Sequence, residues 1–223
     1  FPDACLRSMY RSCGVVSKLA QTQLNQHFYV DQALNFLSIT SIPKLRWSSP
    51  KAFTLKPPIV SVVFLIIGLV VFGLGEALLV TAGVGVSPWT VFAEGVTIVT
   101  GWSLGVATFI ISVSVLLLWI PLRQTPGIGT ILNAIIIALM LQYVLPFLPT
   151  FETFIANALL ALFGVFVTGF GGAIYLVANL GPGPRDGLMT GLQTITHQPI
   201  ALVRTFLEIL VVAIGWTLGG TLG

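Results

Sequence analysis

The stretch GPGPRDGLMTGL, residues 181 to 192, interrupts an otherwise apolar chain with glycines, prolines and an Arg-Asp pair. Laying residue n on residue n+96 aligns residues 59–127 with residues 155–223 without a gap, and fifteen of the 69 positions are identical. The glycine and proline matches are Gly68 with Gly164, Gly73 with Gly169, Gly75 with Gly171, Gly85 with Gly181, Pro88 with Pro184, Gly95 with Gly191 and Gly127 with Gly223. Because these residue types recur where backbone geometry is demanded, an internal repeat is the economical explanation.

The composition is that of a membrane protein. Of the 223 residues 56% are hydrophobic and 8% charged, and the mean hydropathy is +0.99. A soluble domain of this size could not bury so much apolar surface, so we expect an integral protein that contacts the lipid bilayer. Seven of the ten Lys and Arg residues precede residue 59, so the positive net charge does not predict nucleic-acid binding. Cys5 and Cys13 have no partners at metal-site spacing, and neither a metal nor a cofactor is predicted.

Five apolar runs are each near the roughly 20 residues that a helix needs to cross a membrane. They are residues 59–82, 103–121, 127–149, 153–178 and 199–220. The connectors at residues 83–101 and 179–199 each predict a short helix of about 14 residues, near 21 Å and too short to cross comfortably. The expected fold is therefore all-α: a polytopic transmembrane bundle of two repeats with broken, short connector helices.

The repeat also predicts the organisation of the chain. Residues 59–149 form the first membrane repeat and residues 150–223 the second. The first repeat continues past Gly127 into a third span, whereas the second stops at the equivalent Gly223, so five spans are present and a sixth is truncated. Residues 1–58 are polar and mixed and begin without Met. They are interpreted either as a cytoplasmic tail, disordered in part, or as the product of an incorrectly assigned start.

The orientation of the repeats follows from the positive-inside rule. If the connector helices do not cross, each full repeat has three spans, and the second repeat is inserted upside down relative to the first. Lys51 and Lys56 then place the N-terminus in the cytoplasm, and counting spans brings Arg123 and Arg185 to the same side. The loop at residues 149–153 falls outside, where Glu152 is its only charge. A parallel arrangement, in which the connector helices do cross, stays open.

Several motifs resemble a known family. The first span contains GLGEALLVTAG and is followed by GVSPW, while the fourth contains GFGGAIYLVANLG and is followed by GPGPRDGL and then VRTFLE. Over roughly residues 59 to 223 these motifs resemble the YczE family of bacterial inner-membrane proteins, which is related to the YitT group. The resemblance implies a multi-pass protein of the bacterial inner membrane with about six spans, and it supplies no substrate.

The connectors hold the first candidate site residues. In the second connector Gly181 and Gly183 allow close backbone approach, and Arg185 and Asp186 fall at the start of a helix, where free N–H groups gather. A broken helix of this kind can bind an anionic group. The bland alternative is a tight turn in which Asp186 caps the helix and Arg185 anchors it at the interface. The corresponding residues of the first connector are Gly85, Ser87, Pro88 and Trp89.

Charged residues within the spans are the second group of candidates. Arg204 and Glu208 stand four residues apart on one face of the fifth span, where pairing lowers the cost of burying each charge. They either contact a solute or simply staple the bundle. Glu76 lies deep in the first span without a neighbour in sequence to pair with. It is a candidate for a carboxylate coupled to a proton or cation, and a tertiary partner such as Arg204 is equally open.

Two classes of function fit these features. The first is a small transporter or permease that moves a polar or anionic solute by alternating access around the two connectors. The second is an accessory or regulatory membrane protein that docks a partner through its cytoplasmic loops. An enzyme is not predicted, because the two histidines, His27 and His197, lie in the tail and in a loop and no catalytic motif falls within a span. The oligomeric state is not predicted.

Overall fold

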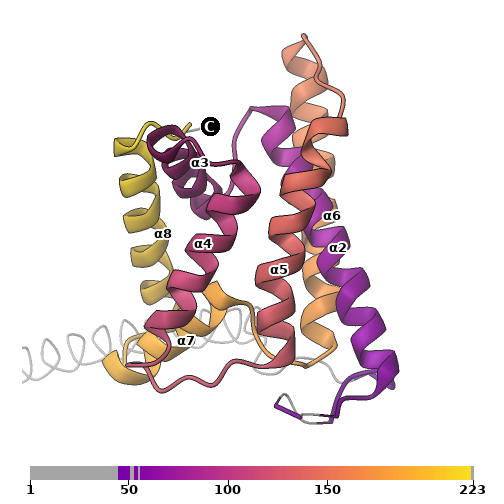
Figure 1. The fold of residues 1–223 in the computed structure, drawn as a ribbon, viewed down its shortest axis with the longest axis vertical. Helices are drawn as coiled ribbons and strands as arrows, with labels where there is room; N and C mark the ends of the chain where they lie inside the picture. The colour runs from indigo at the N-terminus through magenta and orange to yellow at the C-terminus, as the bar shows by residue number, and fades with distance from the viewer. Residues whose placement is uncertain (1–44, 51–52, 55, 222–223) are drawn as a thin grey trace, which may run out of the picture. The chain divides into compact units, whose positions relative to one another are not determined.

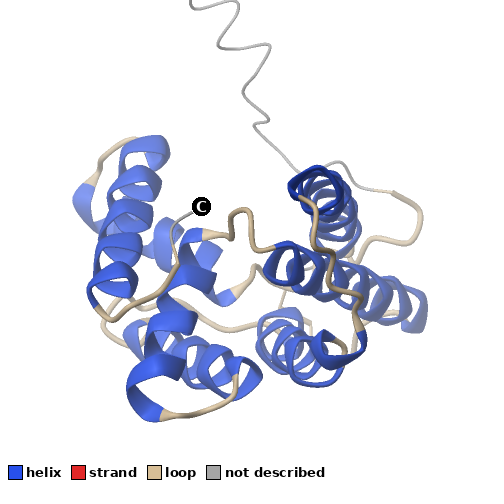
Figure 2. Cartoon of the chain, turned by 90° about the horizontal axis from the view of Figure 1, so that it is seen from above, coloured by secondary structure: helices blue, strands red, loops and turns tan. Residues whose placement is uncertain are grey.

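Long apolar helices make up most of what the structure, a computed structural model, describes: residues 45–50, 53–54 and 56–221. Figures 1 and 2 show this part of the chain as helices and connecting loops, with no strand. The elements are α2 (Ile59–Ala82), α3 (Pro88–Thr100), α4 (Leu104–Leu118), α5 (Ile128–Tyr143), the 3-10 turn η1 (Leu145–Phe147), α6 (Phe154–Val177), α7 (Pro184–Thr196) and α8 (Ile200–Thr217). The predicted all-α class is confirmed.

Both connectors contain a short helix, as expected. The helices α3 and α7 have 13 residues each, and each begins with a proline at its first position, where a missing N–H is tolerated. The helix α3 ends at Gly101, which adopts a φ of +74° and donates its N–H to the carbonyl of Thr97. Left-handed glycine is a common helix stop, so the local sequence fixes both ends of this helix.

The two connector helices lie at opposite ends of the bundle. In Figure 1, α3 lies at the upper end and α7 at the lower end, while α2, α4, α5, α6 and α8 run between the ends. The axis of α3 is bent by 113° from that of α4, so the chain turns back at this end. This arrangement is the one that an inverted repeat requires, because inversion moves equivalent elements to opposite ends.

The described residues contain four helices that are long and apolar enough to cross a membrane, or five if α3 and α4 together form one bent span. The predicted run at residues 103–121 differs from the structure, because α4 ends at Leu118. Pro121 explains the difference, since proline disfavours helical geometry in the residue before it. The predicted number of spans therefore stays a prediction.

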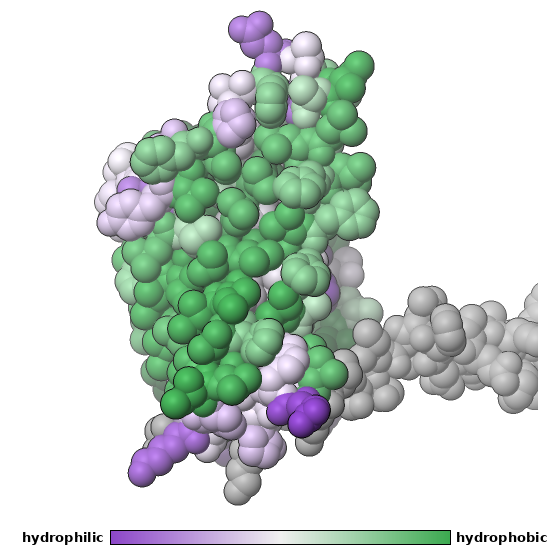
Figure 3. Space-filling view, turned by 90° about the vertical axis from the view of Figure 1, so that its right-hand side faces the viewer, coloured by the Kyte–Doolittle hydropathy of each residue, from purple (hydrophilic) through white to green (hydrophobic). Residues whose placement is uncertain are grey.

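The surface is that of an integral membrane protein. Figure 3 shows a broad apolar face, with hydrophilic groups gathered towards its two ends. Large side chains on the outer face of α6 are exposed, and Phe166 is 69% exposed. A water-soluble monomer does not present an apolar surface of this extent, whereas lipid tails cover it without cost.

Glycines bring α2 and α6 into close contact at equivalent positions of the two repeats. A Cβ added to Gly171 would lie 2.3 Å from the backbone nitrogen of Phe72, and a Cβ on Gly75 would lie 2.5 Å from that of Thr168. The two contacts correspond to each other, because Gly75 is 96 positions before Gly171 and Phe72 is 96 positions before Thr168. Such smooth surfaces allow helix backbones to approach closely in a membrane.

The connector helices pack against the other repeat in the same reciprocal way. The helix α3 packs on α8, where Gly215 lies against the backbone of Phe92, and α7 packs on α4, where Gly187 lies against the ring of Trp119. Gly215 and Trp119 are 96 residues apart, so a small residue in one repeat takes the place of a large one in the other. The connector helix of each half of the chain thus packs on a helix of the other half.

A short part of the N-terminal segment is ordered against the bundle. Ser48 donates its hydroxyl to the carbonyl of Val177 at 2.6 Å, and Trp47 stacks on Phe64 with ring centroids 4.3 Å apart. Residues 47 and 48 of the N-terminal segment thus contact α2 and α6. Residues 1–44 lie outside the described part of the chain.

Candidate functional site

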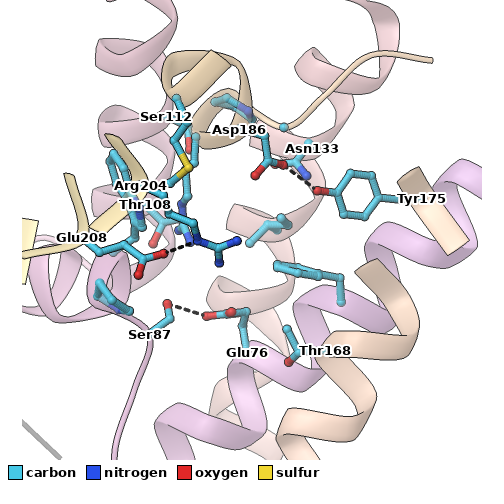
Figure 4. Close-up of a pocket in the computed structure, with 18 residues that line it drawn as sticks. Glu76, Ser87, Thr108, Ser112, Asn133, Thr168, Tyr175, Asp186, Arg204 and Glu208 are labelled. Atoms are coloured by element: carbon cyan, nitrogen blue, oxygen red, sulfur yellow. Dashed lines mark hydrogen bonds and ion pairs between the residues drawn. The ribbon is translucent and has the colours of Figure 1, made fainter. Parts of the chain in front are cut away.

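A polar cavity of about 300 Å³ lies inside the bundle, lined by side chains from α2 to α8. Figure 4 shows its labelled polar groups around the open space, with Asp186, Asn133 and Tyr175 on one side and Glu76 and Ser87 on another. Nine of the eleven candidate residues line it: Glu76, Ser87, Pro88, Trp89, Gly183, Arg185, Asp186, Arg204 and Glu208. Residues far apart in sequence are thus brought to one place.

Twelve of the eighteen lining residues form six pairs that are 96 positions apart. The pairs are Phe72 and Thr168, Ser87 and Gly183, Pro88 and Pro184, Trp89 and Arg185, Thr108 and Arg204, and Ser112 and Glu208. The first turns of α3 and α7 thus begin at the same cavity from opposite ends of the bundle (Figure 1).

Glu76 ties α2 to the start of α3. Its side chain is buried at 5% exposure, and its Oε2 accepts hydrogen bonds from the hydroxyls of Ser87 at 3.3 Å and Thr90 at 3.0 Å. Negative charge is stabilised at a helix N-terminus, which explains how a carboxylate is tolerated here. The hydrogen-bond partners of Glu76 are thus hydroxyl groups of α3 and of the residue before it, and the cation that attracts it is Arg185.

Asp186 ties α7 to α6 rather than capping its own helix. Its Oδ2 accepts a hydrogen bond from the hydroxyl of Tyr175 at 3.0 Å, and no side chain caps the N-terminus of α7. The predicted cap is therefore wrong. Among the connector glycines, Gly181 has a positive φ of +116°. Gly187 serves packing instead, because a Cβ there would lie 2.0 Å from Cζ2 of Trp119.

Arg185 lines the cavity. Its guanidinium carbon is 5.4 Å from the centroid of the Trp89 ring, a cation–π contact. The side chain is half-buried and forms no ion pair with any described residue. Trp89 is 6% exposed, and its Nε1 has no hydrogen-bond partner among the described residues. The alternative of an interfacial anchor is not supported by this position.

The predicted pairing of Arg204 with Glu208 is confirmed. Nε of Arg204 and Oε1 of Glu208 are 2.8 Å apart, and both side chains line the cavity (Figure 4). The side chain of Arg204 is 66% exposed and that of Glu208 34%. The pair therefore forms an open edge of the cavity on α8 and is not enclosed in the core.

The second connector is held from α5. Thr130, fully buried at the start of α5, donates its hydroxyl to the carbonyl of Pro182 at 2.7 Å, and the N–H of Gly129 reaches the carbonyl of Leu180 at 2.8 Å. These bonds satisfy connector carbonyls that the break in the helix would otherwise leave unpaired. Gly181 thus shapes the connector without lining the cavity, and Gly85 does not line it either.

Some lining residues were not predicted. Thr108, Ser112 and Thr168 lie at the cavity, and each is the counterpart of a lining residue in the other repeat. The offset of 96 was therefore a signal that could have found them from Arg204, Glu208 and Phe72. In the described part of the chain no group of three or more His, Cys, Asp or Glu side chains is placed to hold a metal ion.

The comparisons with known proteins agree with the predicted resemblance. The family of unknown function DUF6198 matches residues 59–222. An uncharacterized protein of Haemophilus influenzae is 39% identical over 182 residues, which cover 82% of this chain and 83% of that protein. The uncharacterized membrane protein YczE of Bacillus subtilis is 29% identical over 167 residues, which cover 72% of this chain and 75% of that protein. No solved structure matches the chain.

Proposed function

The chain belongs to the family of unknown function DUF6198, and we propose that it is a transporter of a small polar solute in the bacterial inner membrane, with its N-terminus in the cytoplasm. The observation that carries this proposal is the shared cavity: the first turns of α3 and α7 reach it from opposite ends of the bundle and line it at positions 96 residues apart. Secondary transporters commonly build their sites from such broken helices between inverted repeats.

The proposal includes an inverted repeat. The reciprocal glycine contacts between α2 and α6 support it, as does the packing of α3 on α8 and of α7 on α4. A parallel repeat would bring the two connectors to the same end of the bundle. Their separation in Figure 1 therefore favours inversion.

The buried apolar cores lie on two sides of the cavity. One core joins α3, α4, α7 and α8, while two smaller cores join α2 to α6 and α2 to α5. The helices α4 and α5 connect the two sides, since Gly105 on α4 lies against the backbone of Gln142 on α5. Alternating access would have to change the packing between α4 and α5.

The accessory role, the second class of function predicted from sequence, finds less support. It requires Arg185 to be presented to a partner from a cytoplasmic loop. The side chain instead lies half-buried over Trp89, at the cavity. A docking role does not explain the polar side chains that line the cavity. Because polar groups inside a membrane are costly, such groups usually serve a function there.

Cysteine accessibility tests the proposal without knowledge of the solute. In a chain with Cys5 and Cys13 replaced by serine, we expect Ser112→Cys at the cavity to react with a membrane-impermeant thiol reagent applied to either side of sealed vesicles. The control is Ser114→Cys on the exposed outer face of the same helix, where lipid suppresses the thiolate and prevents labelling. Labelling of Ser112→Cys from one side alone would contradict alternating access to the cavity.

A further inference from the structure

The charges of the cavity lie close to balance, which bears on the class of solute. Two guanidinium groups, of Arg185 and Arg204, and three carboxylates, of Glu76, Asp186 and Glu208, line it. The N-termini of α3 and α7 also begin there, and each is equivalent to about half a positive charge. With these included, positive and negative charge are nearly equal. A solute with a net charge would disturb that balance in a region where lipid surrounds the bundle.

Carboxylates of the chain itself lie near both helix N-termini, although neither accepts a hydrogen bond from the backbone there. Glu76 accepts hydrogen bonds from Ser87 and Thr90 in the first turn of α3, and Asp186 lies in the first turn of α7. An anion that bound at either helix start would have to displace one of them or lie beside it at a cost in repulsion. This arrangement disfavours a purely anionic solute.

Two groups of opposite charge lie near each other at the cavity without direct contact. Arg204 and Glu208 form an ion pair at 2.8 Å. Arg185 forms no direct ion pair with any described residue and lies over the ring of Trp89, although Glu76 and Asp186 are near enough to attract it electrostatically. Glu76 is bonded through Oε2 to hydroxyl groups, and its Oε1 has no hydrogen bond to the described residues. A guanidinium and a carboxylate that attract each other across a cavity without touching can each bind a complementary group of a solute that lies between them.

We propose that the site binds a zwitterion: a small solute with one anionic group that lies against Arg185 and one cationic group that lies against Glu76. This inference rests on the proposed transport function for its biological meaning, since it names the class of solute carried. Such a solute places an opposite charge against Arg185 and against Glu76, and it leaves the net charge of the cavity unchanged. The aromatic rings of Phe72, Trp89 and Tyr175 line the remaining wall and suit an organic body and its cation.

The size of the cavity limits the solute. A cavity of about 300 Å³ lies at the lower end of the range of ligand sites in proteins, about 300–1,000 Å³. Amino acids and small betaines suit a site of this size.

Binding of matched probes to the purified full-length protein tests the inference. The zwitterions are alanine, glutamine and glycine betaine, and each is compared with an analogue that keeps only the anion and one that keeps only the cation. For alanine these analogues are isobutyrate and isopropylamine. Because one hydrogen bond to a charged group is worth about 1.5–3 kcal/mol, at least one zwitterion is expected to bind about tenfold or more tightly than both of its analogues. The inference is overturned if no zwitterion does so, whether all bind weakly or an ion binds equally well.

Two variants test which residue binds which end of the zwitterion. In Arg185→Gln the zwitterion loses its advantage over the amine, and in Glu76→Gln it loses its advantage over the anion. A residue that only supports the fold would weaken all three probes together, and that result in both variants would also overturn the inference. Arg123→Gln, an exposed loop charge outside the cavity, is the matched control and leaves all affinities unchanged.

Uptake into proteoliposomes separates this inference from the proposed function. Selective binding of a zwitterion without uptake supports the ligand class and argues against transport. Uptake of an anion or amine in preference to every zwitterion supports transport and overturns the ligand class.

Discussion

Two buried tryptophans differ in one hydrogen bond, and this difference allows a clean comparison. Trp119, directly after α4, is 2% exposed and donates its Nε1 proton to the carbonyl of Pro184 at 3.0 Å, so it fixes the first turn of α7. Trp89, in the first turn of α3, is 6% exposed, and its Nε1 has no partner among the described residues. Both substitutions by phenylalanine remove the same atoms, but only one breaks a bond.

We therefore expect Trp119→Phe to destabilise the protein more than Trp89→Phe does. Loss of the donor removes one buried hydrogen bond to the Pro184 carbonyl, a cost of about 0.5–1.5 kcal/mol beyond the loss of volume that both variants share. Unfolding of the detergent-solubilised protein, followed by circular dichroism, measures the difference. Equal destabilisation would mean that this hydrogen bond contributes nothing to stability.

At the scale of residues, the sequence predicted pairs that are local and missed those that are tertiary. The spacing of Arg204 and Glu208 on one helix predicts their ion pair, because side chains four residues apart are neighbours in any α-helix. Glu76 has no such neighbour, and its hydroxyl partners come from the far side of a Gly-containing turn. The direction of that turn depends on how α3 packs on α8, which local spacing does not encode.

Helix pairs provide a second matched comparison, within α6. Gly171 lies against the backbone of α2, where an added Cβ would be 2.3 Å from the nitrogen of Phe72. Gly169 has no atom within 4 Å of the equivalent added Cβ. Both glycines recur in the first repeat, so recurrence alone does not distinguish them.

Gly171→Ala is expected to lower the melting temperature, because backbone atoms of α2 cannot yield as a flexible side chain would. Overpacking of this kind costs about 1–3 kcal/mol. Gly169→Ala is expected to leave the melting temperature nearly unchanged. If both variants melt like the parent protein, α2 and α6 are not in the close contact described here.

At the scale of elements, the apolar runs predicted helices well and their ends less well. The first run, residues 59–82, coincides with α2. The run at residues 103–121 overestimates α4, because hydropathy continues through Trp119 and Ile120 although Pro121 ends the helix earlier. Whether a short helix crosses the membrane or turns back is set by tertiary contacts, and hydropathy does not carry that information.

For the whole molecule, the repeat was the most informative feature of the sequence. It predicted that the two connectors correspond, and the structure brings Trp89 and Arg185, which are 96 residues apart, into direct contact. It did not predict that the two connectors line one cavity, because the offset says which residues are equivalent and not how far apart they lie. The cavity arises because α3 packs on α8 and α7 on α4, so each repeat closes the other.

The inverted arrangement makes one prediction that compares equivalent residues of the two halves of the chain. Thr100 and Thr196 are equivalent, exposed residues at the ends of α3 and α7, and each hydroxyl bonds a carbonyl of its own helix at 2.7 Å. Cysteines at these positions therefore have the same local surroundings. In a background without Cys5 and Cys13, we expect Thr100→Cys and Thr196→Cys to react with an impermeant maleimide from opposite sides of intact cells.

Two loop positions calibrate the sides. Glu152→Cys is expected to react from the side of Thr100→Cys, and Arg123→Cys from the side of Thr196→Cys, because the loops that hold them lie at the corresponding ends of the bundle in Figure 1. Reaction of Thr100→Cys and Thr196→Cys from the same side would make the repeats parallel. With parallel repeats, the two halves could not open the cavity to one face of the membrane and then to the other by exchanging equivalent conformations. The case for transport would then rest only on the charges of Arg185 and Glu76 at the cavity.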